Sequence, residues 1–330
     1  MRRLVQWTVT ALVAATTMIA ACGGSNGSTS NTAVETIAKD PVRSGDVQTA
    51  VVATDPSDSL RAIVKGEDGA PLAGATVAWA TTGTGAAVSP RTSQTDAAGL
   101  AATEWTLGHA AGTQAATASL GGASGSPVTF HATATPGPAT NLVKLAGDGQ
   151  TGIISGSFPT QVKVAVTDQF ANPILGATVH FVGTGGITAI NPVVLTDANG
   201  QAVTTVTGAA AAGAGGVTAA VAGITAPVNF TLTTANAVRE VTVGAGISFT
   251  SEFNRSTNPA VDTIAVGQGV LWRWAGGSHS VESTGATSFT SSTISGTAGH
   301  LYVLTFGAAG TYQYDCAVHG TSMSGRVVVH

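Results

Sequence analysis

Three residues with soft or borderline metal-binding atoms lie close together near the end of the chain. The segment YDCAVHGTSM places Cys316, His319 and Met323 within eight consecutive positions. A further histidine, His279, lies in the segment GGSHS, shortly after the mainly apolar segment VLWRW. A thiolate, two imidazoles and a thioether suit copper, because the thiolate favours Cu(I) and imidazole binds both Cu(I) and Cu(II). The residue types and spacing therefore predict a metal centre that can exchange electrons.

These side chains can meet only if strands on either side of them pack together. The segments VREVTVGAGISF (238–249) and VDTIAVGQGVLWRW (261–274) alternate apolar and polar residues, and GTYQYDC (310–316) and GRVVVH (325–330) flank the loop that holds His319. Alternation with a period of two is typical of strands that bury one face. The pattern predicts a Greek-key β-sandwich for this part of the chain.

The same two motifs resemble those of plastocyanin-like cupredoxins. Residues 270–281 match V-x-W-x-W-x-x-G-x-H-S-V loosely, and residues 314–329 match Y-x-C-x-x-H-G-x-x-M-x-G-x-V-V-V. The resemblance implies one type 1 (blue) copper ion per chain. Its implied ligands are the two imidazoles, the thiolate and the axial thioether, in the order His279, Cys316, His319 and Met323. It also implies an electron port at the surface, made of His319 with Ala317 and Val318.

The sequence leaves two alternatives to a copper site open: a zinc site and a free thiol. A structural zinc site usually has more thiolates or three histidines, whereas this part of the chain offers one cysteine. A free cysteine in an ordinary β-sandwich would account for neither the histidines nor the methionine, and a free thiol outside the cell is reactive. Ser280 stands where many cupredoxins have asparagine, which leaves open the hydrogen bond that joins the two ligand loops.

The other polar residues form no recognisable catalytic pattern. A Ser-His-Asp arrangement, a pair of carboxylates and a phosphate-binding glycine loop are not evident, and His300 and His330 match no position of the motif. A multicopper oxidase or a nitrite reductase would need further copper sites and more histidines than one such domain offers. We therefore expect an electron carrier rather than an enzyme, with redox proteins of the cell envelope as its partners.

A duplication with a spacing of about 100 residues precedes this domain. GDVQTAVVATDPSDSLRAIV (45–64) aligns without a gap with GDGQTGIISGSFPTQVKVAV (147–166). Three later pairs keep the register within two residues: GAPLAGATVAW (69–79) with ANPILGATVHF (171–181), TDAAGLA (95–101) with TDANGQA (196–202), and PVTF (127–130) with PVNF (227–230). Repeats of this length are whole domains rather than the units of a solenoid.

Each copy alternates apolar and polar residues between turn signals, which predicts an antiparallel sandwich. Asp96 and Asp197 begin hairpin turns, where local hydrogen bonding accounts for them better than calcium, although calcium between the domains stays open. The copies resemble the bacterial immunoglobulin-like domains of intimin and invasin, which implies a stiff spacer or an adhesive rod. The second copy carries the motif residues Asp168, Pro173, Gly176, Val179 and Phe181, and the first copy has Gly66 in place of Asp168.

Composition narrows the class of protein further. Charged residues make up 9 % of the 330 residues, glycine accounts for 43 of them, and the formal net charge is −4. Short strands joined by tight turns suit this mixture better than a coiled coil or a helical bundle. The sequence has no basic run, so nucleic-acid binding has no electrostatic basis. His109, His131 and His180 are isolated in the two copies, and we expect them to be surface or packed residues.

The first 22 residues, MRRLVQWTVTALVAATTMIAAC, have the order of an export signal: two arginines, an apolar stretch and small residues. The apolar stretch is short for a membrane-spanning helix. The segment IAAC (19–22) resembles the lipobox of bacterial lipoproteins, which implies that Cys22 carries lipid and anchors the chain to a membrane. In that case Cys316 is the single free thiol of the mature chain.

Together these features predict an all-β chain of tandem antiparallel sandwiches. The expected order is a signal peptide (1–21), a lipidated flexible tether (22–42), two immunoglobulin-like domains (43–136 and 137–236) and a cupredoxin domain (237–330). We expect a monomer that is exported and lipid-anchored, with the outer membrane favoured, facing the periplasm or the cell surface. The favoured function is electron transfer by type 1 copper. The alternatives are a structural or adhesive surface protein, and copper sequestration without redox cycling.

Overall fold

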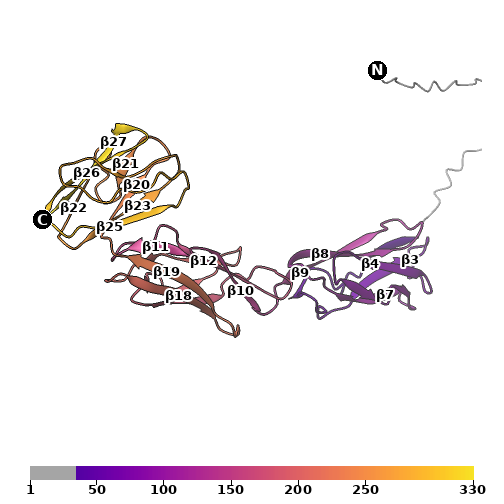
Figure 1. Cartoon of the computed structure of the whole chain (residues 1–330). Coiled ribbons are helices and arrows are strands. Elements are labelled where there is room, and N and C mark those ends of the chain that lie inside the picture. Colours follow the sequence, from indigo (N-terminus) through magenta and orange to yellow (C-terminus); the bar gives the residue numbers. More distant parts are fainter. Residues whose placement is uncertain (1–34) are drawn as a thin grey trace, which may run out of the picture.

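The computed structural model describes residues 35–330, and it consists of three β-sandwiches that follow one another along the chain (Figure 1). The predicted signal peptide and Cys22 lie outside these residues. The regular elements of the described part are strands, which confirms the prediction of an all-β fold. No helix in this part of the chain is long and apolar enough to cross a membrane.

The first sandwich packs a four-stranded sheet against a five-stranded one. The four-stranded sheet has the order β1 (Thr36–Lys39), β3 (Leu60–Lys65), β7 (Leu100–Thr106) and β5 (Ala87–Ser89). The other has the order β2 (Gln48–Val51), β9 (Val128–Thr135), β8 (Gly112–Ser119), β4 (Thr76–Thr81) and β6 (Thr92–Gln94). The inward side chains of both sheets form one hydrophobic cluster that includes Trp79, Trp105 and Phe130.

The first sandwich begins earlier than the sequence indicated. The segment 36–39 lies within the predicted tether, yet it pairs with β3 as an antiparallel strand. Ile37 accounts for the difference, because its side chain is only 3 % exposed and joins the core of the sandwich. A segment of four residues, TIAK, is too short a pattern to be recognised as a strand without its partner.

The second sandwich repeats this architecture. One sheet has the order β10 (Asn141–Ala146), β12 (Val162–Thr167) and β16 (Gln201–Thr204), and a short pair joins β14 (Thr188–Ala189) to β17 (Val206–Thr207). The five-stranded sheet has the order β11 (Gln150–Ile153), β19 (Val228–Ala235), β18 (Gly213–Val221), β13 (Thr178–Thr184) and β15 (Val193–Leu195). β11 runs parallel to β19 as β2 runs parallel to β9, so the strand pairings as well as the sequence are duplicated.

Equivalent side chains make equivalent bonds in the two copies. Gln48 donates to the carbonyl oxygens of Gly45 and Asp58, and Gln150 donates to those of Gly147 and Thr160. The two hairpin aspartates also act locally. Asp96 accepts bonds from the backbone N–H groups of residues 98 and 100, and Asp197 accepts them from residues 199 and 201. These carboxylates therefore have the turn-forming role that their position predicts.

The third sandwich packs two four-stranded sheets. One sheet has the order β21 (Phe249–Ser251), β20 (Arg239–Val243), β23 (Gly269–Trp274) and β25 (Leu301–Thr305). The other has the order β22 (Ala260–Ile264), β27 (Gly320–Val329), β26 (Gly310–Cys316) and β24 (Glu282–Ser283). Strands β20 and β23 run parallel, as do β22 and β27. The segment after β23 holds His279, the β26–β27 turn holds Cys316 and His319, and Met323 lies on β27.

Candidate metal centre

The segment after β23 holds His279 in place through its backbone. The N–H of His279 donates to the carbonyl of Ser295 at 3.0 Å, and the N–H of Ser295 donates back at 2.9 Å. The indole N–H of Trp274 donates to the carbonyl of His279 at 3.2 Å. Because Trp274 ends β23 and is itself buried, these bonds tie the position of His279 to the core of the sandwich.

The tight turn between β26 and β27 presents the other two residues. Cys316 ends β26, and the N–H of His319 donates to the carbonyl of Cys316 at 3.1 Å, which closes the turn. Gly320 follows at a φ of +58°, in the left-handed region that glycine adopts most easily, and begins β27. This turn brings both side chains to the same end of the sandwich.

A second glycine lets β26 and β27 pack closely beside the site. Tyr314 is fully buried and lies opposite Gly325 in the antiparallel ladder. A Cβ atom on Gly325 would overlap both the hydroxyl oxygen and the ring of Tyr314. The Tyr314 ring therefore lies over β27 at Gly325, and a larger residue at position 325 would displace the ring.

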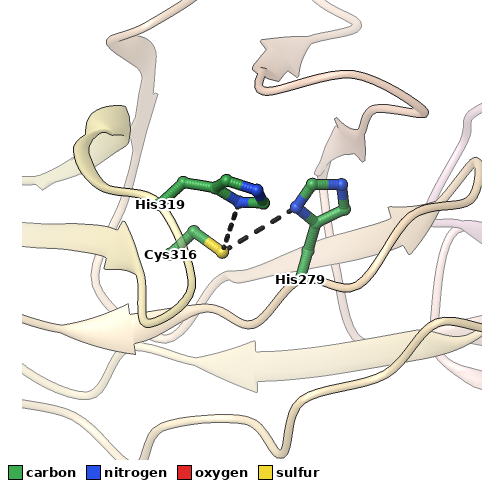
Figure 2. A group of neighbouring side chains, drawn as sticks. All are labelled: His279, Cys316 and His319. Atoms are coloured by element: carbon green, nitrogen blue, oxygen red, sulfur yellow. Dashed lines mark hydrogen bonds between the residues drawn. The ribbon is translucent and has the colours of Figure 1, made fainter.

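Three of the four predicted ligands converge, with their donor atoms turned toward one another (Figure 2). The Sγ atom of Cys316 lies 3.8 Å from Nδ1 of His279 and 3.4 Å from Nδ1 of His319. The three ligand atoms all lie within 4.8 Å of one another. Bonds of about 2.0 Å to nitrogen and 2.3 Å to sulfur at angles near 120° would place N and S about 3.7 Å apart. The observed distances would let all three side chains hold one metal ion.

The site is buried on the side of Cys316 and His279 and partly exposed on the side of His319. Cys316 is 0 % exposed and His279 is 2 % exposed, whereas His319 is half-buried. Burial lowers the pKa of His279, and the nearby His319 lowers it further. A neutral imidazole has a free lone pair, so the surroundings of His279 favour the form that binds a metal.

Met323 lies on β27 and is fully buried in the hydrophobic cluster that contains Cys316. Its role as an axial ligand stays a prediction. The predicted port residues lie in the turn beside His319: Ala317 is exposed, and Val318 is 47 % exposed. An apolar surface thus adjoins the one partly accessible histidine of the cluster.

Ser280 makes the hydrogen bond that the sequence had left open. Its hydroxyl accepts a bond of 2.9 Å from the N–H of Ala317, so it joins the segment of His279 to the turn of Cys316. The side chain is only 2 % exposed. The position of Ser280 next to His279 pointed to this hydrogen bond in the sequence. The short serine side chain can contact the N–H of Ala317 only because the two segments lie very close together.

The other histidines lie apart from the cluster. His300 packs against the ring of Trp274 with a centroid distance of 4.9 Å. His109 stacks on Phe170 with a centroid distance of 4.0 Å, so it lies between the first and second sandwiches. Both have packing roles, as expected for His109.

Comparisons with known proteins concern the fold. The sequence matches no family model and no curated protein at a significant level. The Escherichia coli adhesin FdeC is similar over 90 % of this chain and 96 % of its own, with 17 % identity and a TM-score of 0.43. A purple cupredoxin from Nitrosopumilus maritimus is similar over 28 % of this chain and 98 % of its own, with 20 % identity and a TM-score of 0.23. An oxidized variant of amicyanin is similar over 22 % of this chain and 70 % of its own, with 28 % identity and a TM-score of 0.20.

The structural neighbours therefore include both adhesins and cupredoxins. None of these similarities assigns a role to a residue of this chain. The chemistry of the candidate centre follows from its own donor set, which is one buried cysteine, one buried histidine and one half-buried histidine whose ligand atoms lie within 4.8 Å of one another.

Proposed function

We propose that the third sandwich binds one type 1 copper ion and transfers electrons. The single observation that carries this proposal is the convergence of the Cys316 sulfur with the Nδ1 atoms of His279 and His319. One soft thiolate with two imidazoles is the donor set of blue copper sites, and a structural zinc site would call for further thiolates or histidines. Copper bound there would supply a one-electron redox couple.

The surrounding residues would keep the ligands in one arrangement. The Ser280–Ala317 hydrogen bond joins the two ligand segments, and the Trp274 indole holds the backbone of His279. A site that is held by such outer contacts cannot easily change its geometry when its charge changes. Little reorganisation is what rapid electron exchange requires.

Electrons would enter and leave through the half-buried imidazole of His319. The exposed Ala317 and Val318 beside it would form a surface that a redox partner can cover without removing charged groups from water. The first two sandwiches would act as a spacer between this domain and a membrane anchor at Cys22. The chain would then be an exported carrier rather than an enzyme.

Copper loading of the full chain tests the metal site. We expect an intense visible absorption band and an EPR signal with a narrow copper hyperfine splitting when Cu(II) is added. Both should be lost in Cys316→Ser, because the band depends on the copper–thiolate bond. His319→Ala should weaken both signals because it removes one imidazole, and His330→Ala is its matched control, since His330 is exposed and lies outside the cluster. Uptake of copper by Cys316→Ser with an unchanged spectrum would contradict the proposed site.

Voltammetry then separates the carrier from the alternatives. A reversible one-electron wave supports electron transfer. Copper uptake without a reversible wave would favour sequestration. If the chain takes up no copper at the site, the result would favour the structural or adhesive function. The first two sandwiches would then carry that function.

A further inference from the structure

A cleft lies between the second and third sandwiches, and none of the candidate ligands lines it. It has a volume of about 570 Å³. Its apolar walls include Ile153, Phe158 and Pro159 from the second sandwich and Phe253 from the third. Sites for small molecules commonly have volumes of about 300–1,000 Å³ and often lie between domains. The cleft is therefore large enough for a small organic ligand.

Polar contacts join the two sides of this cleft. Arg273 on β23 pairs with Glu240 at 2.6 Å and also donates to the carbonyl of Thr151, across the domain boundary, at 2.6 Å. The N–H of Ile154 donates to the carbonyl of Ala237 at 2.8 Å. These bonds hold the walls of the cleft in a defined position.

Most of the charged groups in the cleft already have partners. Glu240 is paired with Arg273. Glu252 accepts a hydrogen bond of 2.6 Å from Thr242 and pairs with Arg255. The carboxylates that line the cleft are thus neutralised by neighbouring side chains.

Arg239 is the exception. Its guanidinium lies over the ring of Phe253 at 3.9 Å, and one amino group donates to the carbonyl of Val238. Its Nε is buried and has no hydrogen-bond partner, and none of the ion pairs of the described residues includes it. The charge of Arg239 favours the ionised form of the buried Asp262, whose Oδ1 accepts a hydrogen bond from Ser251 and whose Oδ2, like the Nε of Arg239, has no hydrogen-bond partner. A guanidinium with unused donors therefore lines an otherwise neutralised cleft.

We propose that this cleft binds a small organic carboxylate with an aromatic or other apolar body. A guanidinium presents parallel N–H donors that match a carboxylate, and its stacking on Phe253 already orients it. The apolar walls would cover the body of the ligand, and its carboxylate would pair with Arg239, which lines the cleft and forms no salt bridge within the described residues. A phosphate would bring more negative charge close to Glu240 and Glu252, which favours a carboxylate.

Calorimetric titration of the full chain with phenylacetate tests the proposal, with phenylacetamide as the neutral probe of the same shape. We expect saturable binding of phenylacetate and at least about tenfold weaker binding of the amide, because only the anion pairs with Arg239. Arg239→Gln should weaken phenylacetate binding by about the same factor. Arg326→Gln is the matched control, because Arg326 is an exposed arginine on β27 outside the cleft.

Phe253→Leu provides a second test that does not remove the charge. It keeps an apolar side chain but removes the ring that orients Arg239, so phenylacetate should bind several-fold more weakly. The proposal fails if phenylacetate does not saturate by about 10 mM, or if Arg239→Gln and Arg326→Gln bind alike. It also fails if the amide binds as well as the acid. Binding should be equal with and without copper, so this result and that of the copper site can be told apart.

Discussion

The first two sandwiches and the third differ in how completely they satisfy their buried polar groups. Among the described residues, six buried side-chain atoms have no hydrogen-bond partner. Five of them lie in the third sandwich: Arg239 Nε, Asp262 Oδ2, Trp272 Nε1, His279 Nε2 and Tyr314 OH, of which the Trp272 indole and the Tyr314 hydroxyl lie near each other in an edge-to-face pair. The sixth, Trp105 Nε1, lies in the first sandwich. The third sandwich is about half the size of the other two together, so the difference is not one of length.

Buried polar groups in the first two sandwiches are instead used to hold backbone in place. Thr95 and Thr196 occupy equivalent positions, and each hydroxyl both accepts from a backbone N–H and donates to a carbonyl. Asp168 accepts four hydrogen bonds, from the N–H groups of Gly137, Phe170 and Asn172 and from the Asn172 amide. An acceptor surrounded by N–H donors is not arranged for a cation, so this joint fits hydrogen bonding better than calcium.

The unsatisfied buried polar atoms set the third sandwich apart from the first two. Natural domains leave few buried polar atoms without partners, and the exceptions gather at functional or strained places. The orphaned atoms of the third sandwich include one candidate ligand and the arginine of the cleft. The first two sandwiches leave only Trp105 Nε1 without a partner among the buried polar atoms of their described side chains, as the proposed spacer role requires.

We expect the largest effect on stability from Asp168→Ala, which tests whether buried polar groups hold the first two sandwiches together. It removes the acceptor for four N–H groups at the joint between the first two sandwiches, and we expect a loss of about 3 kcal/mol in the free energy of unfolding of the second sandwich. Denaturant unfolding followed by circular dichroism measures it. Asp55→Ala, at an exposed aspartate, is the control. A loss below about 1 kcal/mol would mean that the joint does not depend on this carboxylate.

The same carboxylate should give the second sandwich a characteristic pH dependence. Burial alone would raise the pKa of Asp168, but the hydrogen bonds from Asn172, Gly137 and Phe170 outweigh it, and the pKa is lowered. A lowered pKa means that the carboxylate stabilises the fold above its usual pKa and that this stability is lost as the pH falls through the lower, folded-state value. Asp168→Ala should remove that component of the acid denaturation curve.

A smaller effect is expected for Ser280→Ala. It removes the acceptor for the N–H of Ala317 and so separates the two ligand segments, at a cost of about 1 kcal/mol to the third sandwich. Copper should also dissociate faster, which stopped-flow competition with a chelator measures. Ser322→Ala, at an exposed serine of β27, is the control. If Ser280→Ala and Ser322→Ala release copper at the same rate, the bond has no part in holding the site.

The smallest change should have the opposite sign. Burial raises the pKa of Asp262, and the Ser251 hydrogen bond and the charge of Arg239 offset it only in part. Because the folded state prefers the protonated acid, ionisation of Asp262 costs stability as the pH rises above the usual pKa. Asp262→Asn keeps an acceptor for Ser251 and should raise stability at pH 7 by about 0.5–1 kcal/mol. A loss of stability in thermal unfolding at this pH would show that the charge is needed.

The duplication could be predicted from the sequence because its signals are local. Turn residues such as Asp96 and Asp197 recur at a constant distance, and the strands between them alternate strictly, so each segment carries its own signal. The start of the first sheet could not be predicted in this way. Thr36–Lys39 becomes a strand only through its pairing with Leu60–Lys65 and the burial of Ile37.

For the candidate site, the donor types and the turn that holds two of them follow from the sequence, because Cys316 and His319 are three residues apart. How close His279 comes to them depends on the folded chain, since 37 residues separate it from Cys316 and the sheets must pack to unite them. The bond from Ser280 to the second segment and the unpartnered Arg239 in its cleft also arise only in three dimensions. Such contacts depend on the distance between chain segments in space, and a linear pattern does not record that distance.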